Sequence, residues 1–161
     1  MKTILVISIS ILSFQIPVFS QSMSFDEALK QAKQENKKII IDVYTDWCGW
    51  CKRMDREAYS NSDVKKVIDE SFILVKLDAE GSKKNNYNGK VYTDSELAAH
   101  FQVTGYPTTV FLSSDGKVIE FNYDNYKLKS FPGYLTAPEF SKVLNYIKDE
   151  KYKDTDLSTI L

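Results

Sequence analysis

The feature that most constrains this chain is its only pair of cysteines, Cys48 and Cys51, which are separated by two residues. A run of β-branched and other apolar residues, 38–45, precedes the pair and is typical of a strand. Residues 52–59 follow it and are compatible with a helix, because two apolar side chains fall four residues apart on one face. In this arrangement the first cysteine lies at a helix N-terminus, where free N–H groups and the helix dipole stabilise a thiolate. The pattern therefore predicts a redox-active dithiol.

Other uses of the two cysteines are weaker. A zinc site usually needs four Cys or His ligands, and His100 is the only histidine that could join the pair. A purely structural disulfide is also disfavoured, because bridging so short a loop removes little entropy from the unfolded chain. His100 itself is expected to be a surface or packing residue. We therefore expect no metal, and no cofactor other than a redox-active disulfide between Cys48 and Cys51.

The first twenty residues have the features of a secretory signal. Lys2 gives a positive start, residues 4–19 form an apolar stretch, and Val18-Phe19-Ser20 is a small-residue cleavage site. A retained membrane anchor is the alternative, although the stretch is short and is interrupted by serines and a proline. Lipid attachment is excluded there, because no cysteine lies near the cleavage site. The sequence predicts a cleaved signal peptide, 1–20, and a periplasmic or secreted domain, 21–161.

The composition of the chain is that of an ordinary globular protein, with 43% hydrophobic residues and a net charge of −1. No basic patch indicates a nucleic-acid partner, and no acidic block indicates bulk electrostatic steering. The length that remains after the signal peptide fits one compact domain.

Three capping boxes predict where helices begin. They start at Ser24, Thr93 and Thr136, each followed by Glu three residues later. The helix that follows the cysteines is expected to restart or kink at residues 61–63, where Asn, Ser and Asp occur together. The charged tail after Asp149 is expected to be loosely held.

Strands and loops fill the segments between these helices. Strands are expected at 38–45, at 72–77 as a central parallel strand, and at 108–112 paired with 117–123 in an antiparallel hairpin. Polar stretches at 81–92 and 124–131 are expected to be loops. Strands that alternate with helices predict an α/β class, with a parallel pair, a terminal hairpin and helices on both faces of the sheet.

Several motifs in this order resemble the thioredoxin family. They are Trp-Cys-x-x-Cys-Lys at 47–52, Val-Lys-Leu-Asp at 75–78, Val-Thr-Gly-Tyr-Pro-Thr at 103–108 and Phe-Pro-Gly-Tyr at 131–134, with Asp42 six residues before the first cysteine. The resemblance extends from residue 38 to about residue 148, and is strongest to secreted thioredoxin-like proteins whose centre reads Cys-Gly-Trp-Cys. It implies a thioredoxin-like fold with a central mixed β-sheet and helices on both faces.

The resemblance also implies roles for residues around the dithiol. Cys48 would be the exposed nucleophile that attacks a substrate disulfide, and Cys51, more buried, would resolve the mixed disulfide. Pro107 would be a cis proline that faces the dithiol, with Tyr106 extended so that a substrate strand has room beside it. An ordinary trans turn proline is the alternative for Pro107.

Asp42 stands inside an apolar strand, where an unpaired charge is unfavourable. Its position matches the family's buried acid, which helps to deprotonate the resolving cysteine, and Lys76 on the neighbouring strand is its expected partner. The alternative is that Asp42 faces solvent. Trp47 is expected to pack beside the site, and Trp50 is expected to be an exposed docking surface for substrate.

The chain departs from the family between its cysteines. Reducing members usually carry Gly-Pro there and oxidising or isomerising members often carry a His, whereas this chain has Gly49-Trp50. The stretches 81–92 and 124–131 are longer than a minimal thioredoxin requires, and the usual first strand is missing before Ser24.

We predict an extracytoplasmic thiol–disulfide oxidoreductase that reduces or isomerises disulfides in secreted proteins and receives electrons from a membrane or periplasmic donor. The alternatives are a dithiol oxidase, and a binding module whose cysteines are idle.

Overall fold

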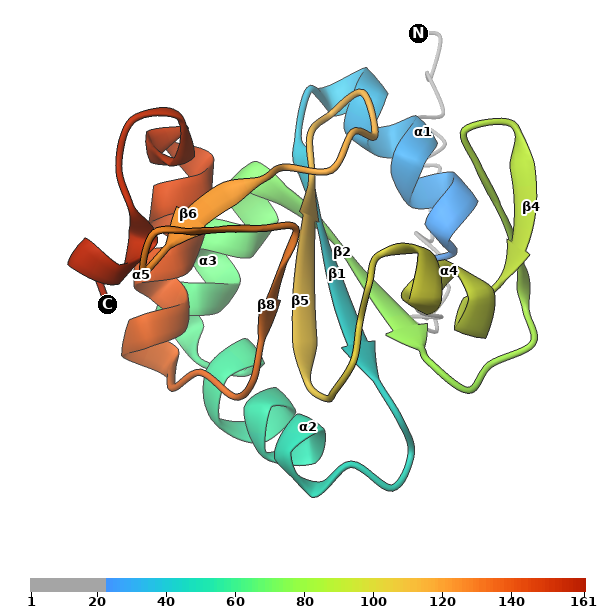
Figure 1. The fold of residues 1–161 in the computed structure, drawn as a ribbon, viewed down its shortest axis with the longest axis horizontal. Helices are drawn as coiled ribbons and strands as arrows, with labels where there is room; N and C mark the ends of the chain where they lie inside the picture. The colour runs from blue at the N-terminus through green and yellow to red at the C-terminus, as the bar shows by residue number, and fades with distance from the viewer. Residues whose placement is uncertain (1–22) are drawn as a thin grey trace, which may run out of the picture.

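A four-stranded sheet organises the computed structural model, which describes residues 23–161 (Figure 1). Its strand order is β2-β1-β5-β8, with β1 parallel to β2 and antiparallel to β5, and β5 antiparallel to β8. The strands are β1 (Lys38–Tyr44), β2 (Phe72–Asp78), β5 (Thr108–Leu112) and β8 (Ser130–Pro132). This mixed sheet confirms the predicted α/β fold class. The predicted signal peptide lies outside the described residues.

Helices cover both faces of the sheet, as predicted (Figure 1). One face carries α1 (Phe25–Glu35) and α4 (Asp94–His100), and the other carries α2 (Gly49–Met54), α3 (Ser62–Ser71) and α5 (Ala137–Lys148). The central strand β1 separates the two cores, because successive strand side chains point to opposite faces. Ile39 and Ile41 pack in the core under α1 and α4, whereas Ile40 packs in the core under α3 and α5. Among residues 23–161, no helix has the length and hydrophobicity of a membrane span.

The helix starts follow the capping residues. Capping boxes at Ser24, Thr93 and Thr136 open α1, α4 and α5, as predicted. Helix α2 continues into a π-helix, η1 (Asp55–Tyr59), and the Asn61 side chain then accepts hydrogen bonds from two backbone N–H groups at the start of α3. The predicted restart at residues 61–63 is therefore confirmed.

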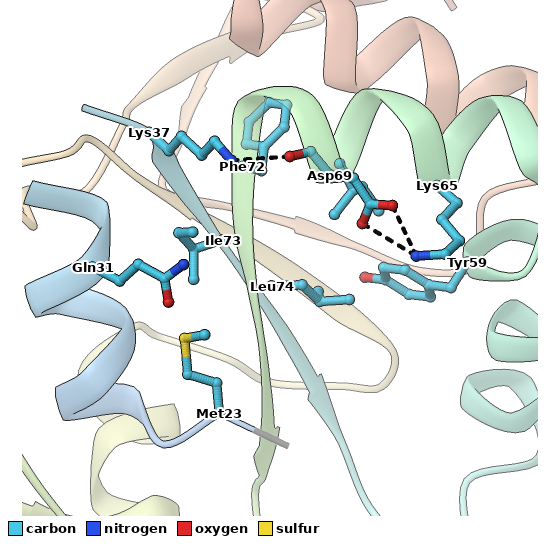
Figure 2. A pocket seen from close by; sticks show the side chains of 10 residues that line it. Met23, Gln31, Lys37, Tyr59, Lys65, Asp69, Phe72, Ile73 and Leu74 are labelled. Atoms are coloured by element: carbon cyan, nitrogen blue, oxygen red, sulfur yellow. Dashed lines mark hydrogen bonds and ion pairs between the residues drawn. The ribbon is translucent and has the colours of Figure 1, made fainter. Parts of the chain in front are cut away.

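The prediction that residues 72–77 form a central strand is wrong in one respect. β2 is parallel to β1 but forms the edge of the sheet, and in the described part of the chain no strand pairs with its other side. The residues of β2 are apolar because α1 and α3 cover the two faces of this strand. A hollow of about 320 Å³ lies along this edge between the two helices, with Ile73 and Leu74 of β2 at its wall and the Lys65–Asp69 ion pair at its rim (Figure 2).

The predicted hairpin of 108–112 with 117–123 is found only next to its turn, where Ser113 and Ile119 N–H groups donate to the Lys117 and Phe111 carbonyls at 2.8 Å. After β5 the returning chain makes one bridge, between Leu112 and Val118, and then leaves the sheet. Phe121 is drawn into the core under α5, so β6 (Phe121–Tyr123) pairs with β7 (Tyr126–Leu128) in a separate ribbon. β8 takes the place beside β5.

The two stretches expected to be loops contain strands. Residues 81–92 hold most of a hairpin, β3 (Lys84–Tyr87) and β4 (Lys90–Thr93), whose turn has positive φ at Asn88 and Gly89. Such left-handed pairs favour tight hairpins even between short polar strands. Residues 124–131 include β7 and the start of β8.

The tail is packed rather than loosely held. Two short 3-10 helices, η2 (Lys151–Lys153) and η3 (Leu157–Thr159), bring Leu157 into the core. The hydroxyl of Tyr146 donates to the Thr155 carbonyl at 2.7 Å, and the Asp156 carboxylate accepts from the backbone N–H groups of the β6–β7 turn. The tail therefore ties the β6–β7 ribbon to α5.

Candidate active site

Cys48 and Cys51 form a disulfide where β1 ends and α2 begins. Cys48 is the N-cap residue of α2, and the backbone N–H of Cys51 donates to Cys48 Sγ at 3.1 Å. In the reduced protein this N–H would stabilise a thiolate on Cys48, because a hydrogen bond to the charged form lowers a pKa. The local geometry therefore favours Cys48 as the more acidic of the two thiols.

The predicted difference in exposure between the cysteines is not found. Cys48 is 4% exposed and Cys51 is 3% exposed, so both are buried in the oxidised protein. The sulfur of Cys48 is turned toward the first turn of α2, where it caps Cys51, whereas the flanking Trp47 and Trp50 are 67% and 55% exposed. The exposed surface of the site is therefore formed by the two tryptophan rings, and both cysteines are buried.

Pro107 follows a cis peptide bond with Tyr106, which confirms the cis assignment and excludes an ordinary trans turn. Strand pairing aligns Val43 with Thr108, so Pro107 lies at the same end of the sheet as the start of α2. Pro107 is buried, and its carbonyl accepts from the Gly133 N–H at 2.8 Å. This contact joins the segment before β5 to the end of β8.

The two tryptophans belong to two different aromatic groups. Trp47 packs edge-on against Tyr106, with ring centroids 5.9 Å apart, and its indole N–H donates to Glu80 at 3.0 Å. Trp50 lies 5.4 Å from the ring of Tyr134 and 5.3 Å from the guanidinium of Arg53. The packing expected of Trp47 and the exposure expected of Trp50 are both found, and their contacts with substrate stay a prediction.

Asp42 is buried, at 2% exposure, which excludes the solvent-facing alternative. It stands opposite Lys76 in the pairing of β1 with β2, and the Lys76 ammonium group donates to its carboxylate, as predicted. Lys76 also donates to Asp55 at 2.5 Å. Sequence reasoning missed Asp55, although an acid four residues after Cys51 lies on the same helix face as that cysteine.

Burial controls the electrostatics of this cluster. Desolvation raises the pKa of Asp42, and the attraction of Lys76 offsets it only in part. Burial by itself lowers the pKa of Lys76, but Asp42 and Asp55 outweigh it, so the net shift is upward. Burial and the charge of Asp42 raise the pKa of Tyr59 well above its ordinary value. Among the described residues, no donor reaches the second oxygen of Asp42. Asp42 is therefore protonated more easily than an ordinary aspartate, and Lys76 is its only donor among the described residues.

His100 lies away from the dithiol and packs on Tyr87 and Tyr92, at ring distances of 5.5 and 5.1 Å. It is a packing residue at the surface, as predicted. Within residues 23–161, no three His, Cys, Asp or Glu side chains are arranged to hold a metal ion.

Comparison with known proteins supports the same assignment. Residues 25–148 match the family model described as a thioredoxin-like domain. A curated relative, disulfide bond reductase DsbH of Chlamydia pneumoniae, is 32% identical over 95 residues. These residues make up 58% of this chain and 57% of DsbH, so the match spans little more than half of the length of that relative.

Two solved structures resemble most of this chain. A thioredoxin-fold protein from Helicobacter pylori superposes with a TM-score of 0.62 and 26% identity, and the match covers 78% of this chain and 80% of that one. A protein proposed to be a disulphide isomerase from Bacteroides thetaiotaomicron superposes with a TM-score of 0.58 and 30% identity, covering 84% and 93% of the two chains. The family match, the Cys48–Cys51 disulfide at the start of a helix and the cis proline at the same end of the sheet agree. This chain belongs to the thioredoxin-like domain family.

Proposed function

We propose that this protein is an extracytoplasmic thiol–disulfide oxidoreductase that reduces or isomerises disulfides of secreted proteins. The observation that carries the proposal is the Cys51 N–H directed at Cys48 Sγ at the start of α2. A disulfide reductase and a protein proposed to be a disulphide isomerase are among its relatives. The extracytoplasmic location rests on the predicted signal peptide, 1–20.

The proposed reaction begins with the reduced protein. The Cys48 thiolate attacks one sulfur of a substrate disulfide, forms a mixed disulfide, and the other substrate sulfur leaves as a thiolate. Cys51, once deprotonated, attacks Cys48 Sγ, breaks the mixed disulfide and releases the second substrate thiolate. Two electrons have then passed from the dithiol to the substrate, and the Cys48–Cys51 disulfide has formed. A membrane or periplasmic donor of two electrons would return the protein to its reduced form.

Asp42 is assigned as the group that takes the proton from Cys51. Its raised pKa brings it nearer to neutral pH, where a carboxylate is a more effective base. Lys76 donates to both Asp42 and Asp55, whose side chain is 46% exposed, so it holds the buried carboxylate in place between β1 and the helix that follows the dithiol. Lys76 is thus a positioning residue in this scheme.

The surface beside the dithiol offers a place for the substrate chain. Pro107 has no N–H to bond, and Tyr106 and Trp47 present paired aromatic surface before β5. An extended substrate segment would lie along this edge with its disulfide next to Cys48. Trp50 would contact the substrate from the other side of the dithiol.

Turnover distinguishes an enzyme from a binding module. Oxidised insulin, or a similar disulfide protein, is mixed with catalytic amounts of this protein and an excess of dithiothreitol, and substrate thiols are counted with time. We expect many substrate disulfides reduced for each molecule of protein, and background rates for Cys48→Ser. Formation of disulfides in a reduced substrate by the oxidised protein, faster than their reduction under the same glutathione ratio, would indicate the oxidase instead. If the protein accelerates neither the reduction nor the formation of substrate disulfides, it is a binding module whose cysteines are idle.

A further inference from the structure

A shallow hollow of about 340 Å³ adjoins the dithiol on the side of Trp50. It is lined by Gly49, Trp50, Arg53 and Arg56. Gly49, Arg53 and Arg56 are spaced by four and three residues along α2 and η1, so they share one face of the helix. A Cβ at Gly49 would meet nothing within 4 Å, which means that the hollow is open to solvent directly beside Cys48.

The hollow carries one uncompensated positive charge, that of Arg56, and packing fixes the shape of the rest. The guanidinium of Arg53 lies over the rings of Trp50 and Tyr134, at 5.3 and 5.2 Å, and its Nε donates to both oxygens of Glu57. The Tyr134 hydroxyl donates to Glu57 at 2.6 Å and holds that carboxylate in turn. Arg56 is exposed and has no ion-pair partner among residues 23–161. One guanidinium is therefore oriented by its neighbours, and the other is free for a ligand.

The opposite side of the dithiol carries the opposite charge. The indole of Trp47 is bonded to Glu80, and Asp46 and Asp78 lie near enough to Tyr44 to raise the pKa of its phenol, after the larger effect of burial. The sign of the surface charge thus changes across the dithiol, from acidic at Trp47 to basic at Trp50. The site therefore favours an acidic substrate residue only on the Trp50 side of the dithiol.

We propose that the hollow binds an acidic side chain of the substrate, a few residues from the cysteine that is reduced. A carboxylate matches the planar guanidinium of Arg56, and the exposed ring of Trp50 covers the apolar part of the same side chain. The inference rests on the proposed function and adds a substrate class to it, disulfides flanked by Asp or Glu. The charge change across the dithiol also sets the direction in which such a segment lies.

The test uses matched disulfide peptides. Each peptide carries one Glu, placed either two residues before or two residues after its reactive cysteine, and each has a Gln counterpart. We expect kcat/KM for one of the two Glu peptides to exceed that of its Gln counterpart by about two- to fivefold at low salt, the range of an exposed ion pair. The preference should fall toward 1 in about 1 M salt, where the Debye length is about 3 Å.

Variants of the chain identify the residues responsible. Arg56→Gln should bring the Glu/Gln ratio of rates close to 1, and Arg56→Glu should bring it to 1 or below. Lys33→Gln removes one exposed positive charge from α1, on the other face of the sheet, and should keep the ratio of the parent protein. Equal rates for Glu and Gln peptides on both sides of the cysteine, or an unchanged ratio in Arg56→Gln, would overturn the inference. Failure to reduce the Gln peptides as well would overturn the proposed function itself, and the inference with it.

Discussion

Asp42 is an ionisable side chain in a place that disfavours its charge. Burial raises the pKa of Asp42, so the folded protein binds this proton more tightly than the unfolded chain does. Stability therefore falls as pH rises from the ordinary pKa of aspartate through the raised one. Asp42→Asn should increase the free energy of unfolding at pH 7, because asparagine buries no charge and Lys76 keeps its ion pair with Asp55. The gain should shrink below about pH 4, where the carboxyl is protonated in both states. Urea unfolding at the two pH values measures both effects.

Asp55 supplies the matched control for this prediction. It is bonded to the same lysine as Asp42, but its side chain is 46% exposed. Asp55→Asn should therefore change the free energy of unfolding by less than about 1 kcal/mol at either pH. A lower stability of Asp42→Asn at pH 7 would contradict the prediction, because it would mean that the ion pair with Lys76 outweighs the burial of the charge.

The two cysteines should react differently once they are reduced. The Cys51 N–H lies 3.1 Å from Cys48 Sγ, so the thiolate should form on Cys48 first. Iodoacetamide should label Cys48 before Cys51, and mass spectrometry of the digested protein reads the order. Cys51→Ser should accumulate covalent mixed disulfides with substrate, and Cys48→Ser should accumulate none. Preferential labelling of Cys51 would reverse the assignment.

Sequence and structure agree on residues whose position in a pattern determines their surroundings. Asp42 could be recognised because a single acid interrupts a strand that is apolar on both faces. Asp55 was missed, because its position four residues after Cys51 places it on the helix face of that cysteine but does not show that Lys76 of β2 reaches it. The burial of Cys48 was also out of reach, because it depends on how its sulfur turns to cap α2.

At the scale of elements, the β3–β4 hairpin is fastened to α1 by one carboxylate. Asp26 accepts from the backbone N–H and from the side-chain amide of Asn86, both at 2.8 Å. Asp26→Ala should reduce the free energy of unfolding by about 1 kcal/mol, since the lost partners are exposed and turn to water. It should also speed hydrogen exchange at the Asn86 amide. Asp26→Asn retains one acceptor and should give an intermediate effect, and an unchanged exchange rate in Asp26→Ala would contradict this role.

Elements were predictable where local chemistry determines them. The capping boxes at Ser24, Thr93 and Thr136 specify helix starts through contacts within four residues, and all three were found. Strand partners depend instead on distant residues. Apolar character alone does not distinguish a strand buried between two neighbours from β2, which is an edge strand covered by α1 and α3. The burial of Phe121 likewise draws β6 away from β5, against the hairpin that the turn residues indicated.

At the scale of the whole molecule, the redox potential depends on all the contacts that stabilise the reduced or the oxidised dithiol. Thiol–disulfide proteins span about −270 mV for thioredoxin to about −120 mV for a strong oxidant, which corresponds to roughly 7 kcal/mol. A strong oxidant gains its potential by stabilising the reduced thiolate. Here Cys48 is buried and no histidine lies between the cysteines, so the charge is stabilised by the start of α2, chiefly the Cys51 N–H, and by no nearby cation between the cysteines. We expect a potential below about −190 mV, in the reducing half of that range.

Two measurements on the intact protein check this expectation. Equilibration against defined glutathione ratios, with free thiols counted at each, gives the potential directly. Urea unfolding of the two forms should show the oxidised protein more stable, by about 2 kcal/mol if closure of this short loop dominates.

Trp50→His places a cation beside Cys51 in the reduced protein and should raise the potential by about 30–60 mV, because an opposite charge stabilises the thiolate. A parent potential near −130 mV, together with a reduced form more stable than the oxidised one, would contradict the reductase and favour the oxidase.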